Sequence, residues 1–392
     1  MKILSTFIRD SKYFDNILSQ SYSIDKYDFH KISNANRFVI PRPGLLYSLK
    51  GRIPLIGIIS LVYVGQFLLP LFLFLVIMKA SLSKRRLSLN GFNSIFLMTD
   101  SISFQKVKNL KEISFDGILS FQNPLKLVLS QKISDNSYYL LFSLKELFAI
   151  YTKTIIHSLY FWIKNIFSFK SLQVFFAMDT FFLDEFRAKL DCSELQEIIF
   201  TDHYCKYALS FSHVKSLRKI QIQHGIFDPK FQPASPIDVD KCYVFNSADK
   251  QVIQNNIHRN SRVKYCYFRQ TLTFEKIGRS NSFKVFFISR LDSFEMEKKL
   301  ITSIRKNYDS DAVELIIKPH PKMSKSRYSD KFYTYMDIIV VEKVFCYPNA
   351  DIVIGSNSTM LFEYEACGFK TFRFDDPNIL DYLKISISKN LD

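Results

Sequence analysis

The sequence predicts an α/β protein built from two consecutive Rossmann-like domains. From Glu194 onward, short apolar runs alternate with helical stretches, a pattern typical of a parallel sheet covered by helices. The alternation begins again after Gly278, which we take as the boundary between the two domains. A chain of 392 residues that is 47% hydrophobic can also build two cores of ordinary size.

The overall charge predicts an anionic partner. Lysine and arginine outnumber the acidic residues to give a net charge of +16, which suits nucleic acid, an anionic membrane surface or a phosphorylated substrate. The basic residues form no known nucleic-acid motif, so we expect no nucleic-acid partner. The six cysteines are scattered without a CxxC pair, which predicts reduced thiols of a cytosolic protein rather than a zinc site or a disulfide framework. Met1–Gln20 lacks the continuous apolar core of a signal peptide.

Residues 1–86 are expected to form a basic arm followed by a membrane-associated segment. Met1–Arg52 shows no clear periodicity and is expected to be a loosely structured arm or a small cap. Ile53–Met78 carries no charge, and as a helix it would reach ~39 Å, against a hydrocarbon core of ~30 Å. Gly65, Gln66 and Pro70 interrupt it, however, and both flanks are basic.

These features favour a re-entrant or interfacial hairpin with both ends on the cytoplasmic side. A hairpin buried in the core of a soluble domain is the alternative. The positions taken to represent membrane contact are Ile53, Leu61, Phe67, Leu75 and Met78.

Residues 87–278 are predicted to form the first Rossmann-like domain. Leu144–Phe169 has apolar residues at three- and four-residue spacings, so it is expected to be an amphipathic helix facing the core or, alternatively, a membrane surface. Tyr207–Lys219 is expected to be a second helix, and a strand passes into a helix within Cys242–Ile253. The other expected strands are Asn93–Asp100, Tyr138–Leu144, Leu172–Asp179, Leu195–Tyr204 and Ile220–Pro229.

Residues 279–392 are predicted to form the second Rossmann-like domain. Its expected helices are Glu295–Tyr308 and Met360–Cys367, the second of which stops at Gly368. The expected strands are Lys284–Arg290, Val313–Ile317, Met336–Glu342 and Ile352–Ile354.

Polar clusters at the ends of these strands are the candidate functional residues. In Gln223-His224-Gly225, the histidine could act as a general base, and Asp202 at the end of an earlier strand is a rival. In Lys318-Pro319-His320-Pro321, the prolines fix the direction of a histidine suited to a phosphate. A structural role is open for each motif.

A third cluster precedes the last predicted helix. Ser356, Asn357, Ser358 and Thr359 suit a helix N-cap or a phosphate cradle, and Glu363 could hold ribose hydroxyls. Ligands of open α/β sheets bind at the carboxyl ends of the strands, so we expect this cluster and the Lys318–Pro321 motif to line one pocket.

The order of these motifs resembles a known family. The HG dipeptide, then KPHP, then a Ser/Thr cluster followed by a helix with a Glu and ending in ACG, is similar to bacterial glycosyltransferases of the two-domain GT-B fold. The nearest groups are capsule and O-antigen enzymes that use CMP-sugars, such as Kdo and sialic acid transferases, and more distantly the teichoic-acid CDP-glycerol polymerases. The resemblance covers roughly residues 194–376. It implies two domains facing a cleft, with His320, Pro321, Ser356, Ser358, Thr359 and Glu363 at the donor.

The expected function is therefore that of a metal-independent glycosyltransferase without a cofactor. The resemblance implies a nucleotide-sugar donor, with a CMP-sugar favoured and a UDP-sugar possible, and a lipid-linked glycan acceptor in O-antigen or capsule synthesis. His224 or Asp202 would take the acceptor proton, while Lys318, His320, Asn357 and their neighbours stabilise the departing phosphate. The protein is expected at the cytoplasmic face of the inner membrane, peripheral or monotopic. The alternatives are a CDP-polyol phosphotransferase on the same fold and a non-catalytic membrane adaptor.

Overall fold

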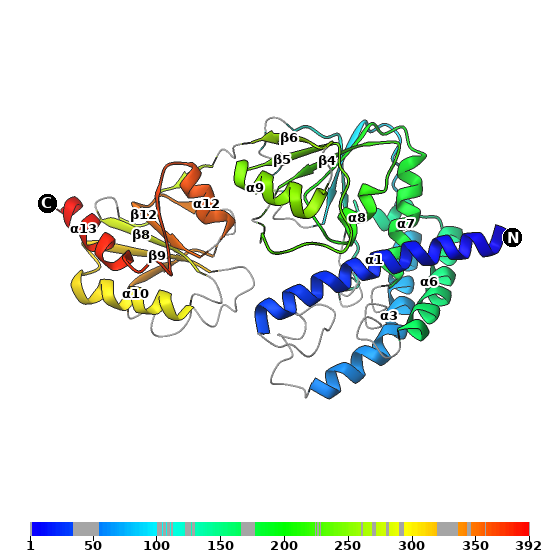
Figure 1. Ribbon diagram of the computed structural model, residues 1–392, viewed down its shortest axis with the longest axis horizontal. Coiled ribbons are helices and arrows are strands. Elements are labelled where there is room, and N and C mark those ends of the chain that lie inside the picture. The colour runs from blue at the N-terminus through cyan, green and yellow to red at the C-terminus, as the bar shows by residue number, and fades with distance from the viewer. Residues whose placement is uncertain are drawn as a thin grey trace. The chain divides into compact units, whose positions relative to one another are not determined.

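The chain divides into two compact units, Met1–Arg269 and Gln270–Asp392. The computed structural model describes residues 2–33, 55–99, 113–121, 130–165, 177–319 and 336–391, together with residues 104, 107, 110 and 127, but not 224, 226, 228, 260, 261, 269–271, 280, 281, 290–293, 343–345 and 357. This division lies before Gly278, the boundary expected from the sequence. Each unit contains its own parallel sheet, which gives an α/β fold with two sheets (Figure 1).

The sheet of the first unit has six parallel strands in the order β2-β1-β3-β4-β5-β6. The strands expected near Ser94, Glu197, Arg218 and Lys241 are confirmed. Side chains alternate across the sheet: Ile95 and Leu97 of β1 face one core and Phe96 faces another. The strands are β1 Ser94–Met98, β2 Gly117–Ser120, β3 Glu197–Phe200, β4 Arg218–Ile222, β5 Lys241–Val244 and β6 Lys264–Tyr267.

Helices pack on one face of this sheet. The expected amphipathic helix is confirmed as α6, whose start is fixed by a capping box between Ser143 and Glu146. The expected helix after Tyr207 is shorter than predicted, because the chain turns after Ser212 and enters β4 at Arg218. The helices are α1 Lys2–Ser33, α3 Leu55–Ser83, α6 Leu144–Lys164, α7 Ala177–Asp191, α8 Lys206–Ser212, α9 Ser247–Val252 and the π-helix η3 Ile253–His258.

The expectation of a loosely structured N-terminal arm is wrong for Lys2–Ser33, which forms α1. This helix packs along α6, α7 and α8 (Figure 1). Its inner face buries Phe14, Ile17 and Leu18, spaced three and one residues apart among polar neighbours. Because Phe14 stacks on Phe181 with ring centroids 5.0 Å apart, α1 is part of the core.

The expectation of a hairpin within Ile53–Met78 is also wrong. Leu55–Ser83 is one helix, α3, which runs through Gly65 and Pro70. It packs on α6, with Phe74 stacked on Tyr151 at 4.8 Å between ring centroids. Among the residues that the structure describes, no helix has the length and apolar character required to cross a bilayer.

In the first unit one strand prediction is wrong, and a second is wrong for the last three of its residues, 177–179. Tyr138–Leu141 is a short 3₁₀ helix, η1, in which both tyrosine hydroxyls donate to the buried Asp179 carboxylate. Those two hydrogen bonds hold the aromatic run in a turn, although its composition favours a strand. Ala177–Asp179, at the end of another expected strand, begins α7, and residues 172–176 lie outside the described part of the chain.

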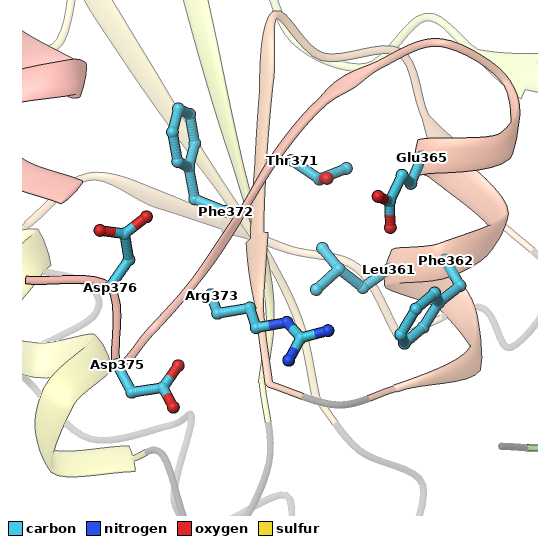
Figure 2. A pocket seen from close by; sticks show the side chains of 8 residues that line it. All are labelled: Leu361, Phe362, Glu365, Thr371, Phe372, Arg373, Asp375 and Asp376. Atoms are coloured by element: carbon cyan, nitrogen blue, oxygen red, sulfur yellow. The ribbon is translucent and has the colours of Figure 1, made fainter. Parts of the chain in front are cut away.

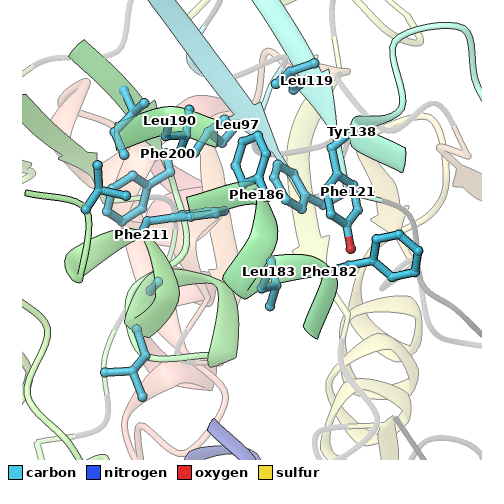
Figure 3. Packing of buried hydrophobic residues seen from close by; sticks show 14 of the residues in the cluster. Leu97, Leu119, Phe121, Tyr138, Phe182, Leu183, Phe186, Leu190, Phe200 and Phe211 are labelled. Carbon is cyan, nitrogen blue, oxygen red and sulfur yellow. The ribbon is translucent and has the colours of Figure 1, made fainter. Parts of the chain in front are cut away.

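The core of the first unit is built mainly from aromatic side chains. Figure 3 shows Phe121, Tyr138, Phe186 and Phe211 packed together between α7 and the sheet. Phe121 stacks on Tyr138 with centroids 4.3 Å apart and meets Phe186 edge-on. Such pairs add to the stabilisation that comes from burial.

The second unit is a doubly wound domain with the strand order β10-β9-β8-β12-β13, all parallel. All of its predicted strands and helices are confirmed within a few residues. Helices α10 and α13 pack on one face of the sheet and α12 on the other. The elements are β8 Phe283–Ile288, α10 Phe294–Asn307, β9 Val313–Lys318, β10 Ile338–Val340, β12 Ile352–Gly355, α12 Thr359–Ala366, β13 Lys370–Arg373 and α13 Ile379–Leu391, with the small pair β7 Phe274–Glu275 and β11 Tyr347–Pro348 beside them.

All six cysteines are free thiols, as the sequence predicts. Four of them are buried or half-buried. Cys192 in the first unit and Cys367 in the second are exposed.

Candidate functional site

The second unit has its topological switch point between β8 and β12. From β8 the chain moves outward to β9 and β10, and it then returns to β12 on the other side of β8. The carboxyl ends of the strands are in register: Gly355 pairs with Ile288 and with Arg373, and Ile288 pairs with Lys318. In open α/β sheets this crevice is where ligands bind.

The Ser/Thr cluster lies directly at this switch point. Ser356 follows the last residue of β12, and Ser358 caps α12 by accepting a hydrogen bond from the Leu361 amide at 3.2 Å. A side chain at position 355 would be crowded against β8, because a Cβ built on Gly355 would lie 3.3 Å from Cβ of Ile288. Ser356, Ser358 and Thr359 are half-buried, and Asn357 lies outside the described residues. A capped helix start at this place offers backbone amides and a partial positive charge to an anion.

Lys318 and Glu363, both predicted to contact the donor, have buried side chains. The Lys318 ammonium donates to the Cys346 carbonyl at 2.7 Å, and the Glu363 carboxylate accepts from the Tyr347 hydroxyl at 2.9 Å. Both contacts hold the segment around β11. Burial, and then the nearby Glu363 charge, raise the pKa of Tyr347, so its hydroxyl stays protonated and donates. His320 and Pro321 lie outside the described residues.

A pocket of about 410 Å³ opens beside the first turns of α12 (Figure 2). The Arg373 guanidinium at the end of β13 lies over the Phe362 ring, 5.7 Å from its centroid. The pocket was not predicted from the sequence, although Arg373 is the last residue of β13 and so lies at the strand ends where ligand-binding residues were expected. The lining residues are Leu361, Phe362, Glu365, Thr371, Phe372, Arg373, Asp375 and Asp376.

The first unit has its own switch point between β1 and β3, and Asp202 lies there. The chain goes from β1 to β2 on one side and then to β3 on the other. Thr99, which follows β1, donates to Oδ2 of Asp202, and the Cys205 thiol donates to Oδ1 at 3.0 Å. Burial and the Asp202 charge raise the pKa of Cys205, so it stays a protonated donor. Asp202 is half-buried.

A chain of hydrogen bonds links the Asp202 backbone to Gln221, His258 and Tyr265. The Gln221 amide donates to the Asp202 carbonyl at 2.7 Å, and its oxygen contacts Nε2 of His258 at 2.7 Å. Nε2 must therefore carry the proton, and Nδ1 accepts from the Tyr265 hydroxyl at 2.8 Å. Burial lowers the pKa of His258 to about 4, so its imidazole stays neutral near pH 7. No sequence motif predicts this role of His258, because the π-helix η3 brings it to β4.

Gln223, which precedes His224 in the sequence, makes two side-chain hydrogen bonds. Its amide nitrogen donates to the Gly225 carbonyl, and its oxygen accepts from the Phe245 amide, both at 2.9 Å. His224 itself lies outside the described residues. Among the described side chains, no group of three or more His, Cys, Asp or Glu is placed to hold a metal ion.

Comparisons with known proteins give low similarity throughout. No family model matches the chain, and no curated protein matches it. The chain is similar at a TM-score of 0.36 and 11% identity to the wall teichoic acid polymerase TagF, over 72% of this chain and 69% of that one. It is similar at a TM-score of 0.33 and 11% identity to the spinosyn rhamnosyltransferase SpnG, over 76% and 84%, and at 0.29 and 14% to S. aureus TarM, over 46% and 42%. At these values the function has to be inferred from the chain's own residues.

Proposed function

We propose that the protein is a glycosyltransferase of the GT-B class that uses a nucleotide-sugar donor. The observation that carries the proposal is the Ser358-capped start of α12, which lies at the switch point of the second sheet beside Ser356. A nucleotide phosphate would accept hydrogen bonds from the first amides of α12 and from the serine hydroxyls. His320 and Pro321 of the KPHP motif follow β9, which lies two strands from β12 in the same sheet, and would complete the donor site.

In the proposed reaction an acceptor hydroxyl attacks the anomeric carbon of the donor sugar. The new oxygen–carbon bond forms as the bond from that carbon to the phosphate oxygen breaks, and the electron pair leaves with the phosphate. Asp202 or His224 takes the acceptor proton, and Thr99 and Cys205 orient the Asp202 carboxylate. The charge on the leaving phosphate is stabilised at the α12 start.

The donor is proposed to be a CMP-sugar, with a UDP-sugar as the other option, and the acceptor a lipid-linked glycan of bacterial surface polysaccharide synthesis. The net charge of +16 supports work at the cytoplasmic face of the inner membrane, where anionic lipids are present. A transfer assay that identifies the moved group separates a sugar from the phospho-polyol of a CDP-polyol phosphotransferase.

The donor site is tested by nucleotide-dependent melting. The wild type is compared with Ser358→Asp, which keeps a capping oxygen but adds a negative charge where the phosphate would bind. Ser143→Asp is the matched control, because Ser143 caps α6 in the first unit in the same way. We expect one of CMP, CDP, UDP and GDP to stabilise the wild type by ~2.7 kcal/mol at a hundredfold excess over its dissociation constant.

Ser358→Asp should lose this stabilisation while Ser143→Asp keeps it, and His320→Ala should weaken it. If none of the nucleotides raises the melting temperature of the wild type, the donor site is wrong, and a non-catalytic adaptor with this fold becomes the better proposal.

A further inference from the structure

Over residues 68–82, the outer face of α3 is mainly apolar. Its exposed residues recur at three- and four-residue spacings, so they lie on one side of the helix. Their exposed fractions run from 38% to 67%, although the opposite face, with Leu73 and Ile77, is fully buried. The exposed residues are Leu68, Leu71, Phe72, Leu75 and Leu82.

The neighbouring helix α6 repeats this arrangement. Leu147 and Ile150 are buried on its inner face, while its outer face carries large apolar side chains with exposed fractions of 44% to 64%. The exposed residues are Phe148, Ile156, Leu159, Tyr160 and Ile163. We call these residues, together with the five on α3, the α3–α6 surface.

The two stripes belong to one packed pair of helices. Phe74 of α3 contacts Phe148 of α6 edge-on at 5.1 Å and stacks on Tyr151 at 4.8 Å. Exposed apolar residues are common singly, but a gathering of this size on adjacent helices marks an interaction site.

The charged residues of α3 and of the segment just after it are basic. Lys79 is exposed on the outer stripe of α3, and Arg85 and Arg86 are exposed just after its end. Residues 53–86 contain no aspartate or glutamate. The acidic residue at the start of α6, Glu146, already accepts a hydrogen bond from Lys189.

We propose that the α3–α6 surface docks on an anionic lipid bilayer, with both helices lying in the plane of the headgroups. An apolar face with a basic edge is the pattern of interfacial helices, whose leucines and phenylalanines enter the acyl boundary while lysine and arginine contact lipid phosphates. A second copy of the chain fits less well, because a two-fold interface uses the same surface of both copies, and residues 53–86 of each copy supply basic but no acidic side chains. Docking would bring the enzyme to its lipid-linked acceptor, and in that respect it rests on the proposed function.

Vesicle binding by the full chain tests the docking surface. The probes are vesicles of phosphatidylcholine alone and of phosphatidylcholine mixed with phosphatidylglycerol. The double variant Phe72→Ser/Ile156→Ser is compared with Leu380→Ser/Ile385→Ser, whose residues are exposed apolar positions on α13 of the second unit. We expect the wild type to bind the mixed vesicles, and the first variant to bind them at least roughly tenfold more weakly, since burying one such side chain contributes about that factor or more. The α13 variant should bind as the wild type does.

Two further readings make the outcome decisive. Trp162 on α6 is the single tryptophan of the chain, so its emission should shift to shorter wavelength on mixed vesicles in the wild type and not in Phe72→Ser/Ile156→Ser. Light scattering gives the oligomeric state. Equal vesicle binding by both variants, or no binding by the wild type, overturns the proposal, and a wild-type dimer that Phe72→Ser/Ile156→Ser makes monomeric shows that a second copy covers the surface instead.

Nucleotide-dependent melting of the same proteins separates this proposal from the proposed function. Phe72→Ser/Ile156→Ser should keep the wild-type shift, because its changes are in the first unit. Vesicle binding without any nucleotide-dependent shift of the melting temperature would support the docking surface and contradict the proposed donor site.

Discussion

Asp179 is a fully buried carboxylate that ties three elements of the first unit together. It pairs with Lys206 at the start of α8 and accepts from the hydroxyls of Tyr138 and Tyr139 in η1 at 2.6 and 2.9 Å. Burial alone would raise the pKa of Asp179, but the Lys206 charge and these hydrogen bonds outweigh it and lower the pKa. The group therefore stays ionised inside the protein.

Removing the cation should be costly. Lys206→Met leaves the Asp179 charge buried without its partner, so we expect a loss of about 3–5 kcal/mol in the free energy of unfolding. Arg218→Met is the control, because Arg218 pairs with Glu197 at a site where the two side chains are 53% and 25% exposed, and it should cost less than ~1 kcal/mol. Urea unfolding measures both, and equal costs would show that the Asp179 pair does not stabilise the fold.

The same pair predicts a dependence on pH. Because the folded-state pKa of Asp179 is lowered, its contribution is complete above the unfolded pKa of about 3.9 and is lost as the pH falls through the folded value. The stability difference between the wild type and Asp179→Asn should therefore be constant near neutral pH and narrow below about pH 4. Urea unfolding over this range checks it, and a difference that widens on acidification would contradict the sign.

Gly278 has a positive φ of 77° and no room for a side chain. A Cβ there would lie 1.8 Å from Oε2 of Glu314, whose carboxylate accepts from the Arg279 amide. We expect Gly278→Ala to cost about 3 kcal/mol, from the left-handed backbone and the displaced carboxylate. Gly368→Ala has a similar φ of 86° with no atom within 4 Å, so it should cost only about 1 kcal/mol. Similar costs for the two variants in urea unfolding would show that the contact with Glu314 is unimportant.

Among the elements, α1 shows that a polar sequence can still form part of a core. Phe14 is 1% exposed and packs on both Phe181 and Phe161. Phe14→Ala should therefore lower the free energy of unfolding by about 3–5 kcal/mol. Ile8→Ala on the same helix changes a residue that is 46% exposed and should cost less than ~1 kcal/mol. If Phe14→Ala costs as little, α1 is not packed on α7 as described.

The elements differ in how far the sequence could predict them. Strands such as β8, β9 and β12 are short β-branched or aromatic runs buried on both faces, so composition and length predict them. The run at Tyr138 has the same composition, but its fate depends on Asp179, forty residues away in sequence, which no local pattern reveals. Helix α1 was not predicted, because the apolar side chains that it is seen to bury, Phe14, Ile17 and Leu18, stand among many charged and polar residues.

The candidate site divides in the same way. Asp202 and the Ser356–Thr359 cluster could be found because each follows a strand, where parallel sheets bind ligands. His258 could not be found, since a π-helix brings it to Gln221. The pocket residues Phe362 and Arg373 come together only through the register of β12 with β13.

For the whole molecule, the net charge of +16 predicts that binding to anionic vesicles is sensitive to salt. The Debye length falls from about 10 Å at 0.1 M to about 3 Å at 1 M, so added salt should weaken the contact of Arg85 and Arg86 with lipid phosphates. Co-sedimentation at rising salt should show a steep loss for the wild type and a shallower one for Arg85→Gln/Arg86→Gln. Lys384→Gln/Lys389→Gln on α13 removes the same charge from the second unit and should keep the wild-type slope, whereas equal slopes in all three proteins would exclude a local basic edge.

The two exposed thiols provide sites for fluorescent labels in the wild-type chain. Cys192 lies in the first unit and Cys367 in the second, while the other four thiols are at least half-buried. A donor dye and an acceptor dye attached to these two cysteines would turn the separation of the units into an efficiency of energy transfer. These label sites need no engineered cysteine, because the wild-type sequence supplies one exposed thiol in each unit.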